Sequence, residues 1–101
     1  MAVTSRLNND GTELTINIEG RFDFSQHQVF RSTIEGNGER VRTFVVDLGR
    51  SEYMDSAALG MLLLLLDKAG GNRERVKIVN ANKDVRKILE IANFDKLFTL
   101  Q

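Results

Sequence analysis

An Asp-Ser pair at the start of an expected helix is the part of this chain whose residue types could do chemistry. Asp55 and Ser56 follow an apolar segment and precede a leucine-rich one. The first backbone N–H groups of a helix have no intrahelical acceptor, and the helix dipole favours negative charge there. A phosphate on the Ser56 hydroxyl would therefore be tolerated by the fold and visible to a partner. Simple capping is the structural alternative, because Asp and Ser are favoured at any helix start.

The elements around this pair are predicted from composition and turn residues. Thr43–Leu48 is rich in β-branched and aromatic residues without clean alternation, which predicts a central strand covered on both faces. A loop over Gly49–Tyr53 then leads to a helix from Ser56 to Ala69, stopped by Gly70-Gly71. The Asp47–Ser56 loop should lie at the carboxyl end of a parallel strand, where partners of such sheets often meet loops.

The first third of the chain predicts a β-hairpin and then a helix. Met1–Leu7 and Glu13–Glu19 flank a turn segment, and the second arm alternates apolar and polar residues. Gly20-Arg21-Phe22-Asp23 breaks that strand. Ser25, with Gln28 three residues later, caps a helix that runs to Glu35 and ends at the glycine-containing segment 36–38.

The last third adds two strands and a helix. Val76–Ala81 is a strand, Asp84–Ala92 has the apolar spacing of an amphipathic helix, and Leu97–Leu100 is a short final apolar segment. Strands that alternate with helices after a leading hairpin predict an α/β fold. We expect a mixed β-sheet with parallel members, joined by right-handed crossovers through helices packed on the sheet.

Composition limits the class of protein. The chain has 101 residues, 42% of them apolar, which predicts a single domain over residues 1–101 with one core. Lys+Arg and Asp+Glu each number 14, so no charge excess favours nucleic acid. The chain has no cysteine and one histidine, which argues against thiolate catalysis and a multi-histidine metal site, and we expect no cofactor.

The same composition indicates a cytoplasmic protein that does not insert into a membrane. The first six residues have no apolar core of a secretory signal. The longest apolar run, Ala57 to Leu66, is about half of the length that a bilayer span requires. The lack of an obvious heptad repeat leaves a monomer as the default for the free protein.

The order and spacing of these segments resemble a STAS domain, and more narrowly the bacterial anti-sigma-factor antagonists. The resemblance covers nearly the whole chain. It is carried by a strand ending in Val46-Asp47-Leu48, by Met54–Gly60 opening a leucine-rich helix, by the upstream Gly20–Asp23, and by Val76–Ala81 before Val85–Leu89. The chain departs from many relatives at Phe22, Ala57 and Ala58, where Leu, Ser or Thr, and Gly are common.

The resemblance implies a STAS-like fold and a signalling protein that is not an enzyme. Ser56 would be the phosphoacceptor and Asp55 its neighbour. The unphosphorylated form would sequester an anti-sigma factor that is also a serine kinase, freeing a sigma factor for transcription. Phosphorylation of Ser56 would release that partner, and a serine phosphatase would restore the bare serine.

We expect the partner to contact the start of the helix and the nearby loops. The residues assigned to this surface are Asp23, Tyr53, Met54, Asp55, Ser56, Leu59, Gly60 and Met61. Tyr53, Met54, Leu59 and Met61 cannot all face the core at helical spacing, so some of them should offer exposed apolar contacts. For Asp23, ending a strand or capping the next helix is the alternative to a contact role.

Two functions of other classes stay open at this stage. Small stand-alone STAS proteins also dock on an ATPase subunit of ABC transporters, and a constitutive accessory subunit would not depend on phosphorylation of Ser56. A hydrolase that used Ser56 as its nucleophile would need an adjacent base, and His27 is the only imidazole available.

Overall fold

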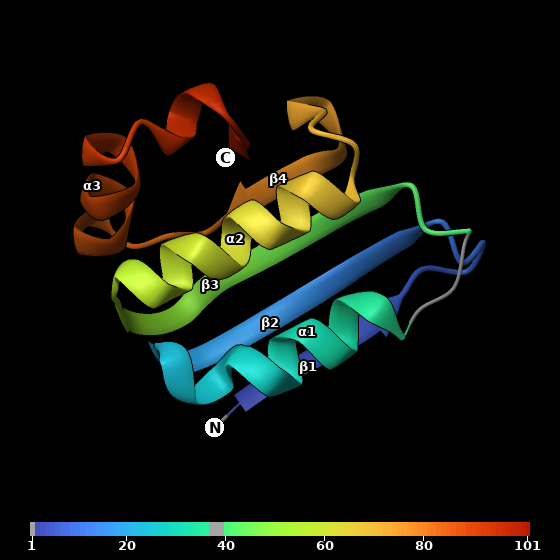
Figure 1. Ribbon diagram of the computed structural model, residues 1–101, viewed down its shortest axis with the longest axis horizontal. Helices are drawn as coiled ribbons and strands as arrows, with labels where there is room; N and C mark the ends of the chain where they lie inside the picture. Colours follow the sequence, from blue (N-terminus) through green and yellow to red (C-terminus); the bar gives the residue numbers. More distant parts are fainter. Residues whose placement is uncertain (1, 37–39) are drawn as a thin grey trace.

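Five strands form one mixed sheet in the computed structural model, which describes residues 2–36 and 40–101 (Figure 1). The spatial order follows the chain: β1 (Ala2–Leu7), β2 (Glu13–Phe22), β3 (Thr43–Met54), β4 (Val76–Val79) and β5 (Thr99–Leu100). β1 is antiparallel to β2, as the predicted hairpin requires, and each later strand is parallel to its predecessor. The predicted mixed α/β sheet is confirmed.

In the described part of the chain, three α-helices and three short 3-10 helices connect the strands. The α-helices are α1 (His27–Glu35), α2 (Ser56–Lys68) and α3 (Lys83–Ile91), and the 3-10 helices are η1 (Phe24–Gln26), η2 (Arg73–Arg75) and η3 (Phe94–Lys96). In Figure 1, α1 and α2 run along the same face of the sheet, α1 over β1 and β2 and α2 over β3. The core lies between this face and the helices, because the buried residues of the strands alternate with half-buried ones.

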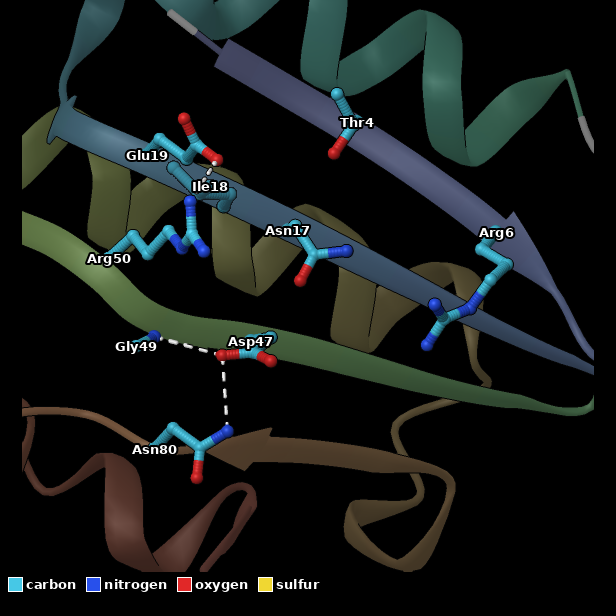
Figure 2. Close-up of a pocket in the computed structure, with 9 residues that line it drawn as sticks. All are labelled: Thr4, Arg6, Asn17, Ile18, Glu19, Asp47, Gly49, Arg50 and Asn80. Carbon is cyan, nitrogen blue, oxygen red and sulfur yellow. Dashed lines mark hydrogen bonds and ion pairs between the residues drawn. The ribbon is translucent and has the colours of Figure 1, made fainter.

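The predicted covering of the central strand on both faces is wrong. Phe44, Val46 and Leu48 are buried, whereas the intervening Thr43, Val45 and Asp47 are only half-buried. The described helices lie on one face of the sheet. Figure 2 shows the other face, with α2 behind the strands and polar side chains such as Asn17 and Asp47 in front. The residue types of β3 reflect its central place in the sheet more than burial on both sides.

The predicted loop over Gly49–Tyr53 is also wrong, because β3 continues to Met54. The prediction that Gly20–Asp23 breaks the preceding strand fails for the same reason, since β2 runs on to Phe22. The two extensions pair with each other through register shifts, so Phe22 lies opposite Met54. Gly20 lies beside one of these shifts with a φ of 78°, a conformation that favours glycine.

The other boundaries agree with the sequence to within a few residues. β4 ends at Val79 because Asn80 takes a left-handed conformation, with φ of 63°. The predicted helix from Ser25 begins as η1, and α1 starts at His27. Ser25 is not the cap: Asp23 holds that position and accepts a hydrogen bond from the Ser25 backbone N–H. Of the predicted glycine-containing turn, residues 37 and 38 lie outside the described residues.

Candidate functional site

The site begins where parallel strands β2 and β3 end at the same edge of the sheet. β2 leads into Asp23 and η1, while β3 leads through Asp55 into α2. The backbone N–H of Asp55 donates to the carbonyl oxygen of Phe22 over 3.4 Å, which joins the two connections. The structure therefore brings the predicted Asp23 next to the Asp-Ser segment, although 32 positions separate Asp23 from Asp55 in the sequence.

Ser56 is exposed in the first turn of α2. Asp55 is the N-cap, and its Oδ1 accepts a hydrogen bond from the backbone N–H of Ala58 over 2.9 Å. The capping alternative is thus realised by Asp55 and not by Ser56. Within the described residues, no hydrogen bond occupies the Ser56 hydroxyl, so this hydroxyl is available to another molecule.

A second serine, Ser51 within β3, differs from Ser56 in its surroundings. Ser51 is 1% exposed, and its hydroxyl donates to the carbonyl oxygen of Ile18 over 2.6 Å, across the register shift between β2 and β3. The Asn82 side chain donates to the Ser51 carbonyl oxygen and caps α3 through the Val85 N–H. Ser51 is a structural group, whereas Ser56 is accessible.

Asp23 has its own set of hydrogen bonds. Its carboxylate accepts from the backbone N–H and the hydroxyl of Ser25, and the Arg21 guanidinium lies 3.4 Å away. The Ser25 hydroxyl is the main cause that lowers the pKa of Asp23 below its ordinary value of 3.8, with smaller help from the Ser25 N–H and Arg21. Asp23 therefore carries its negative charge at neutral pH.

Two exposed aromatic side chains, Tyr53 and Phe24, belong to the same region. The Arg21 guanidinium lies 4.3 Å from the centre of the Tyr53 ring, which is a cation–π geometry. Phe24 is 68% exposed and stacks on His27 with ring centroids 5.4 Å apart. Tyr53 is 40% exposed, in keeping with the predicted contact surface. An exposed phenylalanine beside a polar site is a plausible anchor for another protein.

Two members of the predicted partner surface belong to the core instead. Met54 and Met61 are each 2% exposed, so they support the site from below and cannot be its contact surface. Met54 is buried because β3 continues through it, and Met61 lies on the face of α2 that packs on the sheet. Leu59 is half-buried and Gly60 is exposed, both on α2 beyond Ser56.

The sequence reasoning missed Arg21 and Phe24. The signal for Phe24 was an aromatic residue between two polar ones just after a strand. Arg21 gave no such signal, because its contact with Tyr53 depends on the pairing of Arg21 with Tyr53 across the register shifts. These four side chains, Arg21, Asp23, Phe24 and Tyr53, together with Ser56, are called the switch surface below.

Neither a histidine hydrogen-bonded to Ser56 nor a cluster of metal ligands is present among the described residues. His27 stacks on Phe24, and over residues 2–36 and 40–101 no hydrogen bond links it to Ser56. In the same part of the chain, no three His, Cys, Asp or Glu side chains gather as metal ligands would. None of the helices described is long and apolar enough to cross a membrane.

Comparison with known proteins now bears on this geometry. A family model described as "Mlab, STAS domain" matches residues 5–100. A STAS-domain containing protein of Pseudomonas aeruginosa is 51% identical over 100 residues, which are 99% of this chain and 99% of the relative.

Two solved structures share the fold. The anti-sigma factor antagonist SpoIIAA in its unphosphorylated form superposes with a TM-score of 0.84 at 19% identity, covering 99% of this chain and 88% of that one. An antisigma-factor antagonist STAS domain from Rhodobacter sphaeroides is 28% identical with a TM-score of 0.55, over 81% of this chain and 91% of that one. The predicted resemblance to STAS domains and to anti-sigma-factor antagonists is confirmed.

Proposed function

The chain belongs to the STAS domain family, and from that premise we propose that it is a phosphorylation-controlled anti-sigma-factor antagonist in a bacterial partner-switching pathway. In its unphosphorylated form it binds and sequesters an anti-sigma factor that is also a serine kinase. Phosphorylation of Ser56 releases that partner, and a serine phosphatase reverses the modification. The observation that carries the proposal is the exposed Ser56 of the switch surface, in the first turn of α2, whose hydroxyl makes no hydrogen bond to any residue that the structure describes.

The free protein tolerates the phosphate in this proposal. A phosphoserine adds about 1.5 to 2 negative charges at neutral pH. A helix N-terminus stabilises nearby negative charge by about 0.3 to 2 kcal/mol, which offsets repulsion from Asp55 and the exposed Glu52. The Asp55 carboxylate is already directed to the Ala58 N–H, so the cap survives the modification.

The same charge acts strongly at an interface. An unmatched charge that a partner desolvates costs about 2 to 5 kcal/mol. That cost lowers affinity by roughly 30-fold to several thousand-fold. Phosphorylation therefore weakens binding of the partner, while the fold of the free protein stays the same.

The experiment is site mapping of the protein from its native cells by mass spectrometry, with a Ser56→Ala form as bait for partners. The proposal expects phosphate at Ser56 and capture of a kinase-like regulator. Purified regulator should then bind Ser56→Ala and fail to bind Ser56→Asp. Ser32, which is exposed on α1, serves as the control serine for the same pair of substitutions.

Other outcomes would contradict the proposal. Equal binding of the regulator by the Ala and Asp variants at Ser56 would rule out a phosphorylation switch. An unmodified Ser56 across growth conditions, with an ABC transporter ATPase as the captured protein, would instead favour a constitutive accessory subunit.

A further inference from the structure

Four charged side chains on the face of the sheet opposite the described helices have no ion-pair partner among the residues that the structure describes. They are Arg6 of β1, Glu13 of β2, Asp47 of β3 and Lys77 of β4. Glu13, Asp47 and Lys77 alternate with buried core residues along their strands, so they point away from the helices. Figure 2 shows Arg6 and Asp47 on this face, where both line a hollow of about 640 Å³.

The strand register fixes where these four charges lie. Arg6 is two strands away from β3 and level with Val45, so Asp47 lies two residues further along. Lys77 is also level with Val45, and Glu13 lies two residues before that level on β2. With strands about 4.8 Å apart and a rise of about 3.3 Å per residue, the four Cα atoms form a near-rectangle of about 12 by 8 Å. The charges at its corners alternate in sign, and this set is called the charge rectangle below.

A rectangle of alternating charges is complementary to its own copy. When two copies meet face to face, a two-fold axis through its centre and parallel to either side places every cation over a carboxylate. In one orientation Arg6 faces Asp47 of the copy and Lys77 faces Glu13. In the other, Arg6 faces Glu13 and Lys77 faces Asp47. The described helices lie on the outer sides of such a pair, so they do not obstruct the contact.

We infer that this face binds a second copy of the chain, sheet against sheet, through the charge rectangle. Five strands make the face about 24 Å wide, so the buried area lies near or below the roughly 1,200 Å² at which stable interfaces begin. The dimer is therefore weak, and salt weakens it further. It uses no helical heptad, so the monomer expected from the sequence is the form at low concentration.

Sedimentation equilibrium of the whole protein measures this association without any other partner. Over a concentration series up to about 1 mM, the average mass should rise from that of a monomer toward that of a dimer. The dissociation constant should increase several-fold between about 0.03 M and 0.3 M salt, because the charges lie at the surface.

Charge reversal at one corner of the charge rectangle should weaken the dimer. Glu13→Lys, Lys77→Glu and Arg6→Glu each bring like charges together in both orientations, so each should raise the dissociation constant by about 10-fold or more. Arg50→Glu is the matched control and should leave it unchanged. Arg50 is exposed on the same face, but it lies beyond the charge rectangle along β3. The Tm of each variant verifies that it is folded.

Mixtures of these variants identify the orientation. Glu13→Lys mixed with Lys77→Glu has opposite charges at every contact of the first orientation. Glu13→Lys mixed with Arg6→Glu has them at every contact of the second. One of the two mixtures should therefore associate about as strongly as the wild-type protein, although each variant alone does not.

Three results would overturn the inference. A wild-type protein that stays monomeric over the whole series would leave this face to solvent or to a different protein. Association that Glu13→Lys does not weaken would mean that the copies meet through another surface. Association that neither mixture recovers would show that the four charges do not face one another.

Discussion

At the scale of single residues, the switch surface depends on a small set of directed hydrogen bonds. Ser25 donates two hydrogen bonds to the Asp23 carboxylate, which orient it and lower its pKa. Asp55 caps the first turn of α2. Ser56 follows Asp55 in the first turn of α2, and no residue that the structure describes holds its hydroxyl in a hydrogen bond. The phosphate proposed for Ser56 would therefore add charge beside the Asp55 carboxylate, which already accepts from a backbone N–H, and its main effect would fall on a bound partner.

Replacement of Ser25 by Ala should raise the pKa of Asp23 toward its ordinary value of 3.8, because the Ser25 hydroxyl is the largest cause that lowers it. A lowered pKa in the folded state stabilises the fold above the unfolded pKa. That contribution is lost as the pH falls through the folded pKa. Ser25→Ala should therefore lower the stability at neutral pH and reduce the further loss of stability on acidification. A carboxyl ¹³C NMR titration measures the pKa directly. Ser32→Ala should leave it unchanged.

Phe24 should contribute to binding far more than to stability. It is 68% exposed, so Phe24→Ala removes little buried area from the fold but deletes an aromatic anchor. We expect about a 10-fold or greater loss of affinity for the regulator with an unchanged Tm, measured by calorimetry. Ile91→Ala is the control, because Ile91 is 73% exposed on α3 outside the switch surface. Equal losses in both variants would argue against a specific anchor.

At the scale of elements, the N-terminus of α2 depends on its cap. Asp55→Ala should lower the free energy of unfolding by about 1 kcal/mol, because the Ala58 N–H loses its acceptor. Asp55→Asn should retain most of the stability, since Asn is an equally good cap. Urea unfolding measures both. A loss of similar size in the Asn variant would mean that charge, and not the capping hydrogen bond, stabilises this helix start.

The extension of β3 beyond Leu48 depends on a buried hydroxyl. Ser51→Ala leaves the Ile18 carbonyl without its side-chain donor, which should cost about 1 to 3 kcal/mol of stability. Because β3 leads to Ser56, hydrogen exchange should also rise at Glu52–Met54. Ser5→Ala on the exposed β1 is the control and should change neither measurement. Unaltered exchange at these amides would show that strand pairing alone holds the extension.

These elements also show how far the sequence could predict the structure. The hairpin, α2 and α3 follow from alternation, helical spacing and glycine stops, which are local signals. The extension of β3 was missed because Gly49–Glu52 has the composition of a loop and is held as a strand by pairing with β2.

The site divides in the same way. The place of Asp55 and Ser56 at a helix start could be predicted, because the signals for a helix start lie in neighbouring residues of the sequence. The contact of Arg21 with Tyr53 arises from a register with two shifts, which no local pattern encodes. Helical spacing alone did not show whether the side chains of Met54 and Met61 are buried or exposed. The structure shows that both are buried, because β3 and α2 pack on the core through them.

At the scale of the whole molecule, the fold separates the hydrophobic core from the switch surface. The buried side chains lie between the sheet and the helices, while the switch surface lies at the edge where parallel β2 and β3 end. The chain is electrically balanced, so added charge at one edge produces no large increase in overall repulsion. A phosphate at Ser56 would therefore change the surface that a partner binds and leave the packing of the core unchanged.

Phosphorylated and unphosphorylated protein should accordingly have the same Tm to within a few degrees, because the helix N-terminus offsets the local charge by about 0.3 to 2 kcal/mol. Their affinities for the regulator should differ by roughly 30-fold or more. Scanning calorimetry and titration calorimetry of the two purified forms measure these quantities side by side, and Ser56→Ala supplies the reference that cannot be modified. A phosphorylated form with a Tm far below that of the unphosphorylated form would contradict this prediction. The partner would then be released because α2 unfolds locally, and not because an intact surface gains charge.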